Sequence, residues 1–192
     1  MAKRIGLALV LMLPAAGLVI LFAWKLMTQD AVSSGFAVNS TSVEIYGNDM
    51  EASPFTLGLM NGEQVDLADY RGSIVMVDFW SSWCPPCVKE AAVLQSVYAD
   101  YQGTGVEFLG IAIWDDVENV QAHIQEYGVT YPNGIDVSGA ITVDYGIAGI
   151  PEKVFISPTG DAVRKFVGPF DEDGLTKILD EFLYQYSAEL SD

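Results

Sequence analysis

Apolar positions change their spacing several times along this chain, and each change marks an expected element. From residue 54 onward, short apolar runs alternate with stretches whose apolar residues recur at helical spacing. This alternation predicts an α/β domain with a mixed central sheet flanked by helices on both faces. The expected elements are a hairpin at 55–60 and 63–67, a strand at 73–80, a helix that begins after residue 84, a strand at 106–114, a helix at 117–127, a short strand at 133–137, a short helix at 141–145, a hairpin at 153–157 and 162–167, and a helix at 171–190.

Two of these patterns make sharper predictions. Residues 73–80 form a nearly continuous, Val-rich apolar run, which is typical of a strand that is covered on both faces. We therefore expect this strand at the centre of the sheet. The turn of the first hairpin is Asn61-Gly62, a pair that favours a tight turn with positive φ at both residues.

The first residues of the chain have a different character. Residues 5–24 contain no charged side chain and follow Lys3 and Arg4. An apolar stretch of this length crosses a hydrocarbon core of about 30 Å, so residues 1–28 predict a membrane anchor with its basic end in the cytoplasm. A cleaved signal peptide is the alternative, because it also begins with basic residues and an apolar core. The apolar run exceeds the usual signal-peptide core of about 7 to 15 residues, which favours the anchor.

Residues 29–53 follow this apolar segment and are rich in Ser, Gly, Asn and Ala, with weak periodicity. Such a composition predicts a flexible tether with little regular structure. The folded domain is expected to span residues 54–192.

The charge of the chain is unevenly distributed. All 26 acidic residues lie beyond residue 29, whereas Lys3, Arg4 and Lys25 account for three of the nine basic ones. The strongly acidic outer part repels nucleic acid and anionic lipid headgroups, so we expect no nucleic-acid partner. The acidic residues are interpreted as a solubilising surface.

Cys84 and Cys87 are the only cysteines, and they lie in Trp83-Cys84-Pro85-Pro86-Cys87, directly after the apolar run. A cysteine at a helix start has its thiolate stabilised by unpaired backbone N–H groups and by the helix dipole. One helical turn later, Cys87 is near enough to displace a bound substrate by forming an intramolecular disulfide. The motif therefore predicts Cys84 as nucleophile and Cys87 as resolving cysteine, with this redox-active disulfide and no other cofactor.

Two structural interpretations of the cysteines are weaker. A structural disulfide that closes so small a loop constrains the unfolded chain little. A structural zinc site needs four Cys or His ligands, and the chain offers only His123 besides the two cysteines. We therefore expect no metal, and we expect His123 to be a surface residue of a helix.

Two motifs carry a family resemblance. Residues 77–87 (Val-Asp-Phe-Trp-Ser-Ser-Trp-Cys-Pro-Pro-Cys) resemble the active-site strand and helix start of the thioredoxin superfamily, in particular of its membrane-anchored TlpA/ResA/DsbE-like thiol:disulfide oxidoreductases. Gly149-Ile150-Pro151-Glu152 resembles the second element of the family, a proline in the cis form that faces the cysteines. The resemblance covers roughly residues 54–190. It implies a thioredoxin-like fold with an additional N-terminal β-hairpin, preceded by one transmembrane helix.

Asp78 is a further candidate catalytic residue. An aspartate in so apolar a strand is costly without a partner or a role, and burial raises its pKa, which suits it to exchange a proton with Cys87. An aspartate at a frayed strand end is the alternative. Thioredoxin pairs its aspartate with a lysine on the next strand, but residues 106–114 contain no lysine.

Substrate binding is expected around the cysteines and the proline. A cis Pro151 would turn the backbone of Ile150 toward the sulfurs, so that an extended substrate segment could pair with it. A trans proline in an ordinary loop is the alternative. Trp83 is expected to cover the disulfide, and Glu152 either makes the dithiol more reducing or is a solvated charge. The expected substrate-binding residues are Trp83, Pro85, Pro86, Ile150, Pro151 and Glu152.

The resemblance implies a protein-disulfide reductase on the extracytoplasmic side of a bacterial cytoplasmic membrane. Its expected partners are protein disulfides, with apocytochrome c in cytochrome c maturation as the specific candidate, and a membrane electron donor of the thiol-reducing type. An oxidant that introduces disulfides shares every motif and differs in its potential. Two other functions are alternatives. A thiol peroxidase would have Thr in place of Ser81. A metal chaperone would bind metal through the two cysteines.

Overall fold

The computed structural model describes Leu18, Leu21 and residues 37–187. The expected anchor at 1–28 therefore lies outside the described residues, apart from Leu18 and Leu21. Among the residues that are described, no helix has both the length and the apolar character needed to cross a membrane. All the strands and helices named below belong to the unit Phe36–Asp192.

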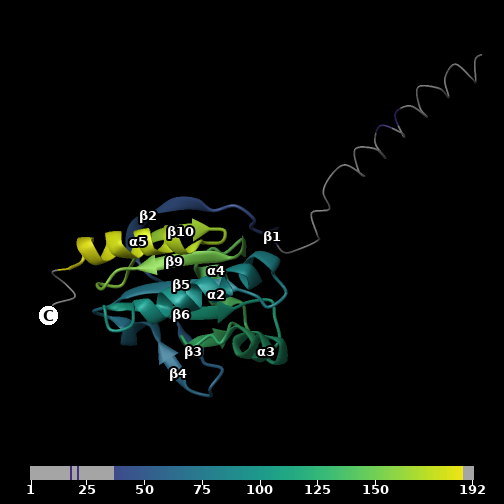
Figure 1. Ribbon diagram of the computed structural model, residues 1–192, viewed down its shortest axis with the longest axis horizontal. Helices are drawn as coiled ribbons and strands as arrows, with labels where there is room; N and C mark the ends of the chain where they lie inside the picture. The colour runs from purple at the N-terminus through teal and green to yellow at the C-terminus, as the bar shows by residue number, and fades with distance from the viewer. Residues whose placement is uncertain (1–17, 19–20, 22–36, 188–192) are drawn as a thin grey trace, which may run out of the picture. The chain divides into compact units, whose positions relative to one another are not determined.

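A six-stranded mixed sheet forms the centre of this unit (Figure 1). The parallel strands β5 (Ile74–Trp80), β6 (Val106–Ala112) and β7 (Asn133–Ile135) form one half of the sheet, and β9 (Glu152–Ile156) pairs antiparallel with β5. Every residue of β5 is buried, and the strand is an interior one, as its apolar run predicted. The order across the sheet is β2 (Val43–Glu51), β10 (Asp161–Val167), β9 (Glu152–Ile156), β5 (Ile74–Trp80), β6 (Val106–Ala112) and β7 (Asn133–Ile135).

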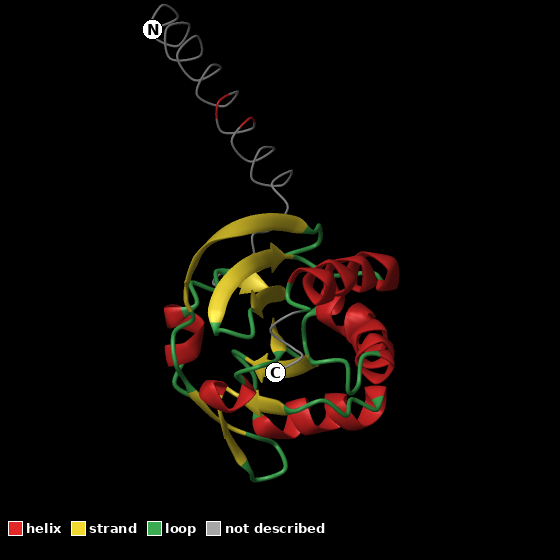
Figure 2. Cartoon of the chain, turned by 90° about the vertical axis from the view of Figure 1, so that its left-hand side faces the viewer, coloured by secondary structure: helices red, strands yellow, loops and turns green. Residues whose placement is uncertain are grey.

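Two apolar clusters cover the two faces of the sheet, because successive residues of β5 point to opposite sides. Ile74 and Met76 pack with the inner faces of α2 (Pro85–Asp100) and α5 (Glu172–Gln185). Val75, Val77 and Phe79 pack with residues of α3 (Val117–Tyr127) and α4 (Ala140–Asp144). Helices accordingly flank the strands on both sides (Figure 2), which confirms the predicted thioredoxin-like architecture.

The additional N-terminal hairpin is present as β3 (Thr56–Gly58) and β4 (Gln64–Asp66), followed by the 3₁₀ helix η1 (Leu67–Tyr70). Its turn differs from the predicted one. Gly62 has a φ of 89°, but Asn61 is not among the described residues with positive φ. The side chain of Asn61 instead accepts the N–H of Glu63, which closes the turn without a left-handed asparagine.

The prediction of a flexible tether at 29–53 is wrong for its described part. β1 (Ala37–Val38) pairs with β8 (Gly149–Ile150), and β2 forms an edge of the central sheet by pairing with β10. Val43 and Ile45 of β2 are 54% and 49% exposed, so these two apolar side chains do not pack in the core. Backbone hydrogen bonds to β10 hold this edge strand in place.

Candidate active site

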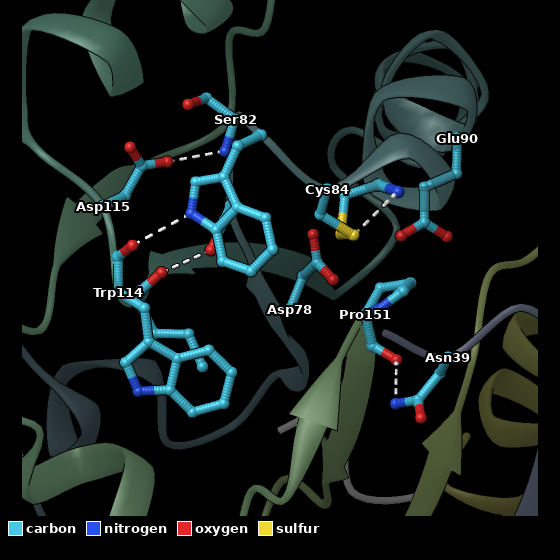
Figure 3. Close-up of a disulfide and its surroundings, with 12 residues drawn as sticks. Asn39, Asp78, Ser82, Cys84, Glu90, Trp114, Asp115 and Pro151 are labelled. Atoms are coloured by element: carbon cyan, nitrogen blue, oxygen red, sulfur yellow. Dashed lines mark hydrogen bonds between the residues drawn. A yellow bond between two sulfur atoms is a disulfide. The ribbon is translucent and has the colours of Figure 1, made fainter. Parts of the chain in front are cut away.

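The two cysteines form a disulfide at the N-terminus of α2 (Figure 3). Cys84 is the N-cap residue, and its sulfur accepts the N–H of Cys87 at 3.4 Å. Pro85 and Pro86 occupy the first helical positions, where a backbone N–H has no partner within the helix. Both cysteines are buried, with Cys84 fully so. The helix dipole and unpaired N–H groups therefore act on Cys84 in an environment with little water.

The loop between β6 and α3 holds the segment that precedes the cysteines. The backbone N–H of Ser82 donates to Oδ2 of Asp115 at 2.6 Å, and the indole N–H of Trp83 donates to the carbonyl of Trp114 at 2.9 Å (Figure 3). Trp114 has a φ of 55°, which is rare for an aromatic residue and marks a constrained backbone. Sequence analysis did not identify Trp114 or Asp115, since nothing in their local pattern indicates contact with Ser82.

Trp83 is 43% exposed, and Pro85 of the same motif is exposed as well. The hydrogen bond from the indole N–H of Trp83 to the carbonyl of Trp114 holds the ring in place. Trp83 therefore presents a fixed apolar surface at the position that directly precedes Cys84 in the sequence.

Asp78 lies in the middle of β5, fully inside the fold, which rules out the frayed strand end. Its register partner on β9 is Lys153, and the two charged groups are 3.3 Å apart. Burial raises the pKa of the Asp78 carboxyl, and the ammonium of Lys153 opposes part of this rise. The parallel neighbour of β5, β6, contains no lysine. The cation comes instead from β9, the antiparallel strand on the other side of β5.

Glu90 joins this pair from α2. Its carboxylate is buried, forms an ion pair with Lys153 and accepts the N–H of Phe170 at 2.9 Å. Burial raises the pKa of Glu90 to about 7, with Lys153 lowering it and Asp78 raising it. Sequence analysis missed both Glu90 and Lys153. The available signals were a glutamate one turn after Cys87 on the inner face of the helix and a lysine within a short buried strand.

We call Asp78, Lys153 and Glu90 the buried charge group. It holds two carboxylates and one ammonium, so that one carboxylate can take up or release a proton while Lys153 continues to neutralise the other. Figure 3 shows the carboxylates of Asp78 and Glu90 in the surroundings of the disulfide, one from the sheet and one from α2.

Glu152 is neither exposed nor solvated. One carboxylate oxygen accepts the N–H groups of Ala148 and Gly149, at 3.3 and 3.0 Å, and the other is 2.7 Å from the ammonium of Lys165. The interpretation as a solvated charge is therefore wrong. Glu152 fixes the backbone that leads into Pro151, and its predicted effect on the cysteine thiolate stays a prediction.

The peptide bond between Ile150 and Pro151 is cis, as the resemblance implied. The backbone edge of Ile150, which we expected to be open to substrate, is occupied by the chain itself. Ala37–Val38 runs parallel to Gly149–Ile150, and the N–H of Asn39 donates to the carbonyl of Ile150 at 2.6 Å. Residues 37–39 lie within the predicted tether, so the sequence does not predict this contact.

His123 is buried, contrary to the prediction of a surface residue. Its ring centroid lies 4.5 Å from that of Trp80 and 4.6 Å from that of Tyr127. This face of α3 packs against the sheet, and burial lowers the pKa of His123, which favours the neutral imidazole.

Comparison with known proteins agrees with this geometry. The AhpC/TSA family matches residues 49–165. The thiol-disulfide oxidoreductase ResA of Geobacillus thermodenitrificans is 28% identical over 149 residues, which are 78% of this chain and 84% of the relative. ResA of Bacillus anthracis is 30% identical over 118 residues, which are 62% of this chain and 68% of the relative.

Solved structures give the same result. A secreted disulfide oxidoreductase of Mycobacterium tuberculosis, homologous to DsbE of Escherichia coli, has a TM-score of 0.61 and 30% identity over 66% of this chain and 95% of that one. A thiol:disulfide interchange protein from Chlorobium tepidum has a TM-score of 0.66 over 72% of this chain and 99% of that one, at 24% identity, and so supports the fold alone.

A thioredoxin-like fold with a Cys-x-x-Cys disulfide at a helix start defines an enzyme of the thiol:disulfide oxidoreductase class. The chain belongs to the AhpC/TSA family, as a TlpA/ResA/DsbE-like member of the thioredoxin superfamily.

Proposed function

We propose that this enzyme reduces disulfide bonds in other proteins through its Trp-Cys-Pro-Pro-Cys dithiol. The observation that carries the proposal is the position of the Cys84–Cys87 disulfide, at the N-terminus of α2 and in the surroundings of the buried charge group. In the reduced enzyme, the helix N-terminus stabilises the thiolate of Cys84. The carboxylates provide a base for the thiol of Cys87.

The reaction has two exchange steps. The thiolate of Cys84 attacks one sulfur of the substrate disulfide, and the other substrate sulfur leaves as a thiolate. The thiol of Cys87 then loses its proton and attacks Sγ of Cys84, which releases the second substrate thiolate. Two electrons pass from the dithiol to the substrate, and the enzyme is left with the disulfide that the structure contains.

Proton transfer from Cys87 is assigned to the buried charge group. Asp78 and Glu90 both have raised pKa values, and that of Glu90, about 7, matches a group that exchanges protons near neutral pH. Lys153 contacts both carboxylates, so their protonation states depend on one another.

The resemblance and the N-terminal pattern support the proposed substrate and location. Lys3, Arg4 and the apolar residues 5–24 support an anchor in a bacterial cytoplasmic membrane, with the catalytic unit on its extracytoplasmic side. Apocytochrome c, whose haem-attachment site is a Cys-x-x-Cys-His sequence, is the proposed substrate. A membrane electron donor of the thiol-reducing type would restore the dithiol.

The experiment that tests this function is substrate trapping. The full-length Cys87→Ser variant should hold its partners as mixed disulfides with Cys84, because the resolving thiol is missing. The Cys84→Ser variant is the matched control and should hold none. Recovery of no c-type cytochrome or haem-assembly protein would count against the proposed substrate.

The direction of electron flow is tested separately by titrating the pair against glutathione. A reduction potential above about −150 mV would contradict a reductant and favour an enzyme that introduces disulfides. Rapid consumption of peroxide, or tight stoichiometric metal binding without reduction of insulin, would favour a peroxidase or a metal chaperone instead.

A further inference from the structure

The cis-proline loop carries a strand of the same chain. Ala37–Val38 pairs with Gly149–Ile150 in register, with Val38 opposite Ile150. The carbonyl of Ile150 accepts the N–H of Asn39, and the carbonyl of Pro151 accepts the side-chain amide of Asn39 at 3.3 Å (Figure 3). The N–H and C=O of one residue in a strand point to the same side. An extended substrate that pairs with Ile150 therefore needs the place that Ala37–Asn39 occupies.

The segment that follows this strand is firmly attached to the domain. The hydroxyl of Ser42 donates to the carbonyl of Pro169, and a Cβ on Gly168 would lie 2.2 Å from the carbonyl oxygen of Thr41. Only glycine, with a φ of 106° at position 168, allows these two segments of the chain to pass so closely. The chain continues into β2, which pairs with β10 from Val43 to Glu51.

These attachments differ greatly in extent. β1 contributes two register pairs, whereas β2 contributes six. Residues 37–39 can consequently leave the cis-proline loop while β2 keeps the sheet intact, because opening begins where a segment has the fewest contacts.

We propose that Ala37–Asn39 is a built-in competitor of the substrate, which pairs with Ile150 in the free enzyme and must leave before a peptide disulfide can bind. This inference rests on the proposed function, since it concerns the regulation of the same site. The competitor reduces the apparent affinity for an extended peptide by the fraction of molecules in which the edge is open. It does not act on small disulfides that need no backbone pairing.

The variant that tests this is Asn39→Pro in the full-length chain, because proline removes both the backbone N–H and the side-chain amide. We expect kcat/KM for a disulfide within an extended peptide to rise about fivefold, the factor that corresponds to one backbone hydrogen bond of average net strength, because the longer side-chain bond of 3.3 Å adds little to it. The rise should come from a lower KM. Reduction of a small aromatic disulfide, dithiobis(nitrobenzoate), should stay unchanged.

Val38→Pro is the matched control. In this parallel pairing Ile150 bonds to residues 37 and 39, so the N–H of Val38 points away from β8. The same ring at position 38 should therefore change the peptide KM less than twofold. An equal rise in both variants would show that chain stiffness, rather than the lost bond, is responsible, and would overturn the proposal.

A binding measurement separates this inference from the proposed function. A dye-labelled peptide with the sequence of residues 36–42 contains no cysteine and cannot exchange disulfides. Its fluorescence anisotropy should show about fivefold tighter binding to Asn39→Pro than to the unmodified protein. Equal affinities would overturn the inference. Tighter binding without reduction of any disulfide by either protein would support the displaced strand and contradict the proposed reductase.

Discussion

Lys153 lies opposite Asp78 across the β5–β9 pairing, with its ammonium 3.3 Å from the Asp78 carboxylate and no exposed surface. The same ammonium pairs with Glu90 on α2. A single lysine therefore neutralises carboxylates from the sheet and from the helix that begins at Cys84. Its removal should affect both the stability of the fold and the protonation of the cysteine site.

Replacement of Lys153 by Met should lower the free energy of unfolding by about 3–5 kcal/mol, because two buried carboxylates lose their cation. Urea unfolding at neutral pH measures the loss. Adding Glu90→Gln should recover part of it, since only Asp78 then lacks a partner. Lys177→Met, at an exposed position of α5, is the control and should change stability little. An equally small change for Lys153→Met would contradict the ion pairs described above.

Glu90 predicts a specific pH dependence of stability. Burial raises its pKa from 4.5 to about 7, so between these values the folded protein binds more protons than the unfolded chain. The contribution of Glu90 is therefore fully present below about pH 4.5 and lost as the pH rises through 7. Urea unfolding from pH 4 to 8 should show a decline in this window that is reduced in Glu90→Gln. Identical pH profiles would show that Glu90 titrates normally.

The strands and helices with strong periodicity could be predicted from the sequence, and the edge strand could not. β5 is buried on both faces and α3 ends at Gly128 with a φ of 62°, and both are visible as local patterns. In β2, Val43 and Ile45 remain exposed, and the strand is paired with β10 through its backbone. Such bonds are available to any sequence and leave no mark in the apolar pattern.

The same distinction applies to the active site. Cys84, Cys87 and Asp78 belong to one strand–helix connection, and a motif of contiguous residues identifies them. Lys153 and Glu90 reach Asp78 from two other elements, 75 and 12 positions away in the chain. The family resemblance places the cation on β6, the parallel neighbour of β5, whereas Lys153 lies on β9, its antiparallel neighbour. The buried charge group therefore required the three-dimensional register.

Asp115 should position the segment before the cysteines. Asp115→Ala removes the acceptor for the N–H of Ser82, a bond to a charged group worth about 1.5–3 kcal/mol. We expect a loss of stability of this size by thermal or urea unfolding, together with a lower kcat/KM for disulfide reduction. Asp144→Ala changes an exposed aspartate at the end of α4 and serves as the control. Unchanged kinetics with lost stability would limit Asp115 to a structural role.

Substitutions of Glu152 can separate the two roles proposed for this residue. Glu152→Gln keeps an oxygen that can accept the N–H groups of Ala148 and Gly149 but loses the charge that pairs with Lys165. If the carboxylate disfavours the Cys84 thiolate, the variant should lower the pKa of Cys84 in the reduced enzyme and make the pair less reducing. The pH dependence of thiolate absorbance and the glutathione titration measure the two effects.

The Glu152→Ala variant also removes the acceptor oxygen. It should lower the free energy of unfolding by a further amount of about 1–3 kcal/mol, because two backbone N–H groups lose their partner. A Gln variant with unchanged thiol pKa and potential would assign Glu152 to the support of the cis-proline loop alone.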